Sequence, residues 1–180
     1  MVASDLPSPP SFNALEAWAG VGRVIRAAAD MAPWRLPEQQ KAALVSCGVP
    51  LLNGVVDVVS FRAEPTMYRL AGYSLDRQQP RWIYAAAPET GRVLEMSVGS
   101  ARFVNSSINH WLCSLHLVGT WLAGSTAIQH WDEDEAMEEL ALAELTDLLE
   151  QIARLDPAAY GDVGDHRTHF WPAVLDRWLY

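Results

Sequence analysis

Short β-favouring runs lie together in the middle of the sequence, and this grouping constrains the fold more than any other feature. The runs cover residues 67–73, 81–87 and 92–98, and Gly, Pro, Asp and Ser residues separate them. Residues 88–91 read Pro-Glu-Thr-Gly, which is typical of a tight turn. Consecutive strands joined in this way predict an antiparallel β-meander, to which residues 102–104 would add a short strand.

Helical periodicity flanks the meander on both sides. Before it, apolar residues at three- and four-residue steps predict a helix over residues 11–30, and a second helix over 37–48 is stopped by Gly48-Val49-Pro50. After it, the Asn-Ser-Ser of residues 105–107 can cap a helix that ends at Gly124-Ser125. A further helix is expected over residues 133–154, with these side chains facing inward: Met137, Ala141, Leu145, Leu148 and Ile152.

The order of helices, then strands, then helices predicts an α+β fold and not alternating βαβ units. We expect a flexible Pro/Ser-rich tail at residues 1–10 and a single domain over residues 11–180. Residues 158–168 are expected to form a loop. The aromatic-rich segment 169–180 is compatible with either helix or strand.

The formal net charge of −9 separates classes of partner. Nucleic-acid binders use Lys and Arg to displace counterions from phosphates, so we expect no nucleic acid as a partner. The acidity favours a basic partner or serves solubility alone. The first residues lack the positive and apolar regions of a signal peptide, and no apolar run has membrane-spanning length. We therefore expect a cytoplasmic protein that does not bind membranes.

Motifs for catalysis, cofactors and metals are missing from the sequence. It contains no nucleophile elbow, phosphate loop, dinucleotide fingerprint or zinc-deaminase signature, so we expect no catalytic residues and no cofactor. Cys47 and Cys113 are far apart and favour buried reduced thiols. His166 and His169 lie near Asp162 and Asp165, but no third imidazole or thiol is close in sequence, so we expect no metal site.

An acidic run beginning at residue 132 is the most unusual local feature. No Lys or Arg occurs from residue 103 through residue 153. One interpretation is local, because Asp132 can cap a helix and Glu135 can complete a capping box. The other is a patch that meets a basic groove of a partner. Trp131 fits either a binding anchor or the core. The candidate partner-binding residues are Trp131, Asp132, Glu133, Asp134, Glu135, Glu138 and Glu139.

An ordered string of features resembles the SUKH immunity superfamily, and its fourth group best. The string begins with the helix that runs from Leu36-Pro37 to the Gly48-Val49-Pro50 stop, and it continues with the strand Arg81-Trp82-Ile83-Tyr84. The turn around Gly91 follows. The most specific part opens the next helix and consists of Phe103, Val104, Asn105, Ser106 and Ser107. Together these features span about residues 36–122.

The resemblance implies a SUKH-like α+β fold and a role as the antidote to a co-encoded polymorphic toxin. Toxins of such systems are often nucleases or nucleic-acid deaminases, which carry basic substrate grooves. The resemblance implies binding and transfers no catalytic residue. The expected function is occlusion of the toxin's active site or substrate groove. The alternatives are an adaptor or regulatory scaffold with the same fold, and an enzyme whose structure would show a deep polar cleft.

Overall fold

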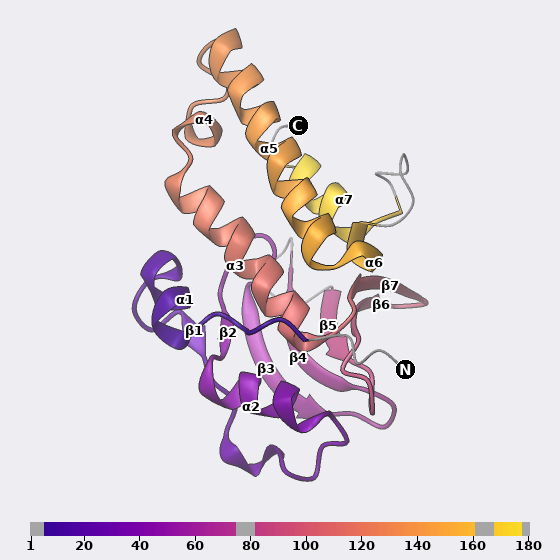
Figure 1. The fold of residues 1–180 in the computed structure, drawn as a ribbon. Helices are drawn as coiled ribbons and strands as arrows, with labels where there is room; N and C mark the ends of the chain where they lie inside the picture. The colour runs from indigo at the N-terminus through magenta and orange to yellow at the C-terminus, as the bar shows by residue number, and fades with distance from the viewer. Residues whose placement is uncertain (1–5, 75–81, 161–167, 178–180) are drawn as a thin grey trace.

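A computed structural model describes residues 6–74, 82–160 and 168–177 of the chain (Figure 1). The N-terminal part contains α1 (Phe12–Ala19), β1 (Val24–Ile25), η1 (Ala29–Met31), α2 (Glu38–Ser46) and β2 (Val49–Pro50). The middle contains β3 (Val58–Ala63), β4 (Tyr68–Tyr73), β5 (Trp82–Ala86), β6 (Val93–Ser97) and β7 (Ser100–Asn105). The C-terminal part contains α3 (Ile108–Gly124), α4 (Thr126–Gln129), α5 (Glu135–Leu155), α6 (Pro157–Tyr160) and α7 (Phe170–Asp176).

The middle strands form one antiparallel sheet in the order β3-β4-β5-β6-β7, which confirms the predicted meander and the α+β class. The turn predicted at residues 88–91 joins β5 to β6, and Ala87 N–H donates to the Arg92 carbonyl at 2.9 Å. The strand expected at 102–104 is longer and begins at Ser100. The sequence reading missed β3, which pairs with β4 across a register shift between Val59 and Arg62.

The helix expected over residues 11–30 is wrong beyond Ala19. Ser11 caps α1 by accepting a hydrogen bond from Ala14 N–H at 3.2 Å. Gly20 then adopts a φ of 100°, which ends the helix, and the chain turns into β1. β1 pairs antiparallel with β2 in a small separate sheet. The segment after Gly20 therefore forms a strand and a short 3-10 helix instead of continuing α1.

The C-terminal helices match the expectation with additions. α3 ends at Gly124 as predicted, and the short helix α4 follows it. The residues of α5 predicted to face inward are buried except Met137, which is half-buried. The loop expected at 158–168 begins instead with α6, and residues 161–167 lie outside the described parts of the chain. Within the open segment 169–180, Phe170–Asp176 is a helix.

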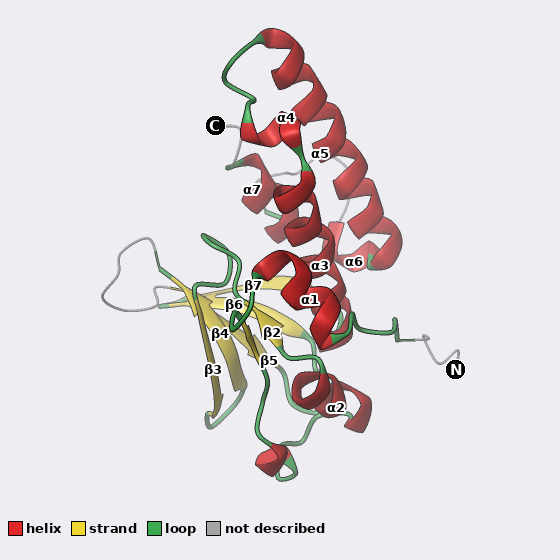
Figure 2. Cartoon of the chain, turned by 90° about the vertical axis from the view of Figure 1, so that its left-hand side faces the viewer, coloured by secondary structure: helices red, strands yellow, loops and turns green. Residues whose placement is uncertain are grey.

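The helices cover one side of the sheet, where the main core lies (Figure 2). Tyr84 of β5 is fully buried there, with its ring centroid 5.4 Å from that of Trp111 and 5.7 Å from that of Phe170. Trp18 of α1 lies over Gly119 of α3, where an added Cβ would come within 2.3 Å of the indole. The sheet, α3 and α7 therefore share one core, against which α1 packs closely.

Among the described helices, none combines the length and the apolar character that crossing a membrane requires.

Candidate partner-binding surface

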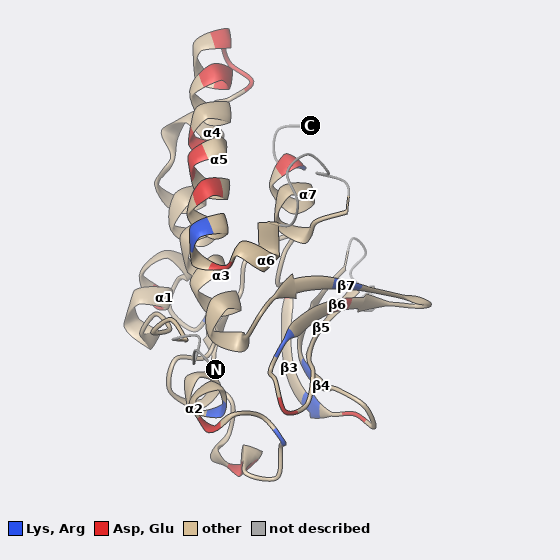
Figure 3. Cartoon of the chain, turned by 45° about the vertical axis from the view of Figure 1, so that its right-hand side comes forward, with Lys and Arg blue, Asp and Glu red and all other residues tan. Residues whose placement is uncertain are grey.

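The predicted acidic residues gather where α4 turns into α5, at the end of α5 that lies furthest from the sheet (Figure 3). All of them are exposed, and we call this group the acidic pole: Asp132, Glu133, Asp134, Glu135, Glu138 and Glu139. The structure thus brings together the carboxylates that the sequence reading selected. Their use by a partner stays a prediction.

Local contacts engage two residues of the acidic pole. Asp134, not Asp132, is the N-cap of α5, and its Oδ1 accepts from Met137 N–H at 2.8 Å. Glu133 lies 2.7 Å from the Nδ1 of His130. Among the ion pairs of the described residues, none includes Asp132, Glu135, Glu138 or Glu139. Helix capping therefore accounts for one carboxylate and leaves most of the charge open to solvent.

Trp131 has an intermediate position beside the acidic pole. Its side chain is half-buried and packs against the main core cluster. The side chain contributes to the core, and its exposed part is available as a binding anchor, so the structure is consistent with both interpretations of Trp131.

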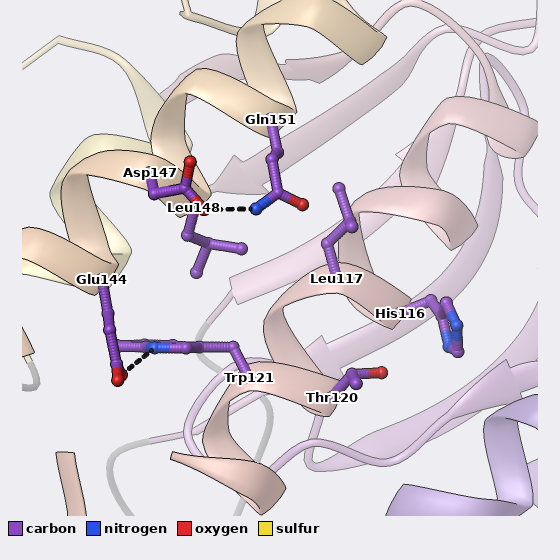
Figure 4. Close-up of a pocket in the computed structure, with 8 residues that line it drawn as sticks. All are labelled: His116, Leu117, Thr120, Trp121, Glu144, Asp147, Leu148 and Gln151. Atoms are coloured by element: carbon purple, nitrogen blue, oxygen red, sulfur yellow. Dashed lines mark hydrogen bonds between the residues drawn. The ribbon is translucent and has the colours of Figure 1, made fainter. Parts of the chain in front are cut away.

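A groove of about 290 Å³ lies between α3 and α5 below the acidic pole (Figure 4). Leu117 and Leu148 give it apolar surface, and Trp121 of α3 lies along one side. Glu144 accepts from Trp121 Nε1–H at 3.0 Å and from the Ser125 hydroxyl, so this carboxylate ties the two helices together.

The α5 side of the groove supplies hydrogen-bond acceptors, whereas Thr120 and His116 on the α3 side also carry donors. Asp147 is exposed, and its Oδ2 accepts from Gln151 Nε2 at 2.8 Å. His116 lines the same groove, and its Nδ1 accepts from Trp18 Nε1–H at 3.0 Å. Burial lowers the pKa of His116 below its usual value, because the interior disfavours the charged ring. No Lys or Arg is among the described residues that line the groove.

Sequence reasoning missed this groove. The sequence predicts that Glu144, Asp147 and Gln151 share one side of a helix, because they are three and four residues apart. It does not predict that α3 lies opposite them, because that depends on how α3 and α5 pack.

The family-motif glycine Gly91 has a structural role. Its φ is 70°, and an added Cβ would lie 1.9 Å from the Oε1 of Gln40. Gln40 is 2% exposed. Its Oε1 accepts a hydrogen bond at 2.9 Å from the N–H of Ile108, which is the first residue of α3. Its Nε2 donates to the Thr90 carbonyl at 2.9 Å. Gly91 therefore makes room for a side chain that joins α2, the β5–β6 turn and α3.

The motif before α3 forms a buried polar network around Asp156, which is 2% exposed. Asp156 Oδ2 accepts from Asn105 Nδ2 at 3.0 Å and from Ser106 N–H at 2.8 Å, and Oδ1 accepts from the Ser106 hydroxyl at 2.7 Å. Asn105 Oδ1 accepts from Trp171 Nε1–H at 3.0 Å. The network joins β7 to α7 and to the C-terminal end of α5.

The other motif residues also serve the fold. Ser107 is the N-cap of α3, as the sequence predicts, and its hydroxyl accepts from His110 N–H at 3.2 Å. Val104 is fully buried. Phe103 is half-buried, with the Arg92 guanidinium carbon 5.5 Å from its ring centroid. The structure places this motif in the scaffold and the acidic pole on the surface.

A second concavity, of about 600 Å³, lies where β4–β7 meet α7. Glu95 is 1% exposed there, and its carboxylate accepts from Tyr73 O–H at 3.1 Å and from Arg102 Nη2 at 2.6 Å. Burial and the charge of Glu95 raise the pKa of Tyr73 to about 12. These groups hydrogen-bond to one another, so the cleft holds a satisfied ion pair.

The described residues contain no group of three His, Cys, Asp or Glu side chains placed to hold a metal ion. Asp162, Asp165 and His166 lie outside the described residues, and His169 is the N-terminal flanking residue of α7. Cys47 is buried and Cys113 is half-buried, and both are free thiols.

Residues 6–10 lie beside α3, and the structure describes their contacts. Asn109 Nδ2 donates to the Pro7 carbonyl at 3.1 Å, and Cys113 lies 3.4 Å from the Ser8 carbonyl oxygen. Part of the segment expected to be a tail therefore contacts the helix, and the domain boundaries stay a prediction.

Comparison with known proteins identifies one matching family. The model of the SUKH-4 immunity proteins matches residues 10–177, a longer stretch than the string of features that carried the resemblance. No curated protein and no solved structure matches the chain.

Proposed function

Because this chain belongs to the SUKH-4 immunity protein family, we propose that it binds and neutralises a cognate polymorphic toxin by non-covalent contact. The acidic pole covers a basic substrate groove of the toxin, whose enzymatic domain is a nuclease or a nucleic-acid deaminase. Neither catalysis by the chain nor a cofactor takes part, and the encounter occurs in the cytoplasm.

The charge distribution is the observation that carries this proposal. Residues 1–102 contain 10 basic and 9 acidic side chains, whereas residues 103–180 contain 3 basic and 13 acidic ones, which together make the net charge of −9. Residues 103–180 therefore hold the net negative charge, and the acidic pole exposes a large share of it at one end of α5. Such a field accelerates encounter with a positively charged groove and disfavours acidic partners.

The direct test uses the toxin gene encoded beside this one. Co-expression should restore growth of cells that carry the toxin, and the purified chain should capture the toxin domain in a pull-down. If no neighbouring toxin is bound or neutralised, the immunity role is wrong. Specific capture of a protein unrelated to toxins would support the adaptor alternative instead.

A charge-reversal pair tests the surface. In Glu138→Lys with Glu139→Lys, we expect association with the toxin to slow by about tenfold or more at low salt, and its salt dependence to weaken. Stopped-flow or surface-binding kinetics measure both. The matched control is Asp30→Lys in η1 with Glu38→Lys at the start of α2, which changes the net charge equally. The helix α2 lies at the opposite end of the molecule from the α4–α5 turn (Figure 1). An equal loss in both pairs would remove the acidic pole from the interface.

A further inference from the structure

The groove between α3 and α5 combines open hydrogen-bond acceptors with apolar and aromatic side chains. Asp147 uses one carboxylate oxygen to accept from Gln151, and its Oδ1 has no hydrogen-bond partner among the described residues. Gln151 donates through Nε2, so its Oε1 remains available as an acceptor. Of the two carboxylates that line the groove, Glu144 already accepts from Trp121 and Ser125, so Asp147 and Gln151 supply the open acceptors next to apolar and aromatic surface.

We propose that this groove binds an arginine side chain of the partner toxin, an inference that rests on the proposed function and adds a defined contact to it. The guanidinium donates to Asp147 Oδ1 and Gln151 Oε1. The methylene stem lies on Leu117 and Leu148, and the planar head lies near the indole of Trp121.

Arginine fits this combination better than other side chains. A guanidinium has donors in a fixed planar fork and no acceptor, so it complements the acceptors that Asp147 and Gln151 offer on the α5 side. It also packs on aromatic rings, which a compact ammonium does less well. An apolar residue would cover Asp147 Oδ1 and Gln151 Oε1 and leave these two oxygens without partners, which costs free energy.

The surroundings also favour a cation. Burial lowers the pKa of His116, which lines the groove, so at neutral pH its ring is mainly uncharged and hardly repels the guanidinium. Arg154, the arginine of α5, does not line the groove, and its Nη1 lies 3.8 Å from Oε2 of Glu150. Toward the acidic pole, Leu140 precedes Glu144 by one turn and is 47% exposed, so apolar surface continues from the groove to the pole.

The test uses a defined probe and does not require the toxin. Full-length ¹⁵N-labelled chain is titrated with N-acetyl-arginine N′-methylamide and followed by NMR. We expect saturable shifts of the Trp121 indole N–H and the Gln151 side-chain amide. The neutral analogue N-acetyl-citrulline N′-methylamide should produce much smaller shifts, because it lacks the charge.

Two variants locate the contact. Asp147→Asn should weaken arginine binding by about threefold, in the range of a solvent-exposed ion pair. Glu150→Gln removes the same charge from the same helix outside the groove and should leave the binding unchanged. The spectra of both variants also show whether the fold is retained.

Shifts that spread over the acidic pole, equal shifts with citrulline, or an equal loss in both variants would overturn the proposal. Arginine binding in the groove without any toxin partner would leave this site standing and refute the immunity role. If a toxin binds with the same affinity to Asp147→Asn, and arginine causes no shifts, the immunity role stands and the arginine site is refuted.

Discussion

The two ends of α5 use carboxylates in opposite ways. At the N-terminal end the acidic pole lies in solvent, and five of its six members form no ion pair among the described residues. At the C-terminal end Asp156 is 2% exposed and accepts hydrogen bonds from Asn105 and Ser106. The same side-chain type therefore holds the fold together at one end and supplies surface charge at the other. Burial and partners, not residue type, decide the role.

The largest effect on stability is expected at the buried end. Asp156→Ala should lower the free energy of unfolding by about 3–5 kcal/mol, because it removes the carboxylate that accepts three hydrogen bonds and leaves Asn105 Nδ2 with only the Ser114 hydroxyl as acceptor. Denaturant unfolding followed by tryptophan fluorescence measures the change. Asp156→Asn keeps one acceptor oxygen and should cost less. A loss below about 1 kcal/mol for Asp156→Ala would break the comparison, since the network would then be dispensable.

A smaller loss is expected at the contact between Gly91 and Gln40. Gly91→Ala should cost about 2–3 kcal/mol, because the new Cβ overlaps the Gln40 amide and the φ of 70° disfavours any side chain. In a Gln40→Ala background the overlap disappears, and the same substitution should cost only about 1 kcal/mol. Thermal and denaturant unfolding of the four proteins give this cycle. Strictly additive costs would contradict the steric explanation.

Within the acidic pole, neighbouring aspartates should differ. Asp134→Ala removes the N-cap of α5 and should cost about 1 kcal/mol. Asp132→Ala, two residues away and exposed, should change stability by less than about 0.5 kcal/mol. Helix content by circular dichroism and unfolding curves distinguish them. Equal costs would show that the α4–α5 turn depends on both carboxylates.

The smallest expected effect is a pH dependence that arises in α3. Burial lowers the pKa values of His110 and His116 in the folded chain, so the unfolded chain binds protons first as the pH falls. The histidine contribution to stability is therefore full above about pH 6.5 and is lost progressively below it. His116→Gln should flatten the slope of unfolding free energy between about pH 7 and pH 5. An unchanged slope would assign the acid sensitivity to other groups.

Much of the fold was readable because its signals are local. The turn at residues 88–91 and the N-cap Ser107 depend on short-range chemistry, and both were predicted correctly. β3 was missed because it lies before the grouped runs and its pairing with β4 is irregular. The α1 prediction ran too far because periodicity outweighed the break at Gly20.

The candidate site could be predicted only in part, because only local patterns show in the sequence. A run of acidic residues shows in the sequence, but it does not tell which aspartate caps the helix. Asn105 and Ser106 looked like caps alone, because their partner Asp156 lies about 50 residues away in the chain. The α3–α5 groove also depends on packing between distant segments, so no local pattern could place it.

The anchoring of α5 at its C-terminal end has an evolutionary consequence. Since the buried network fixes the base of the helix, the solvent-facing turns at the other end can exchange residues while the protein still folds. Under the proposed function, changes of surface charge at the acidic pole could redirect the protein toward another toxin, while Asn105, Ser106 and Asp156 would be constrained by folding. On that proposal, recognition and foldability would therefore depend on opposite ends of a single helix.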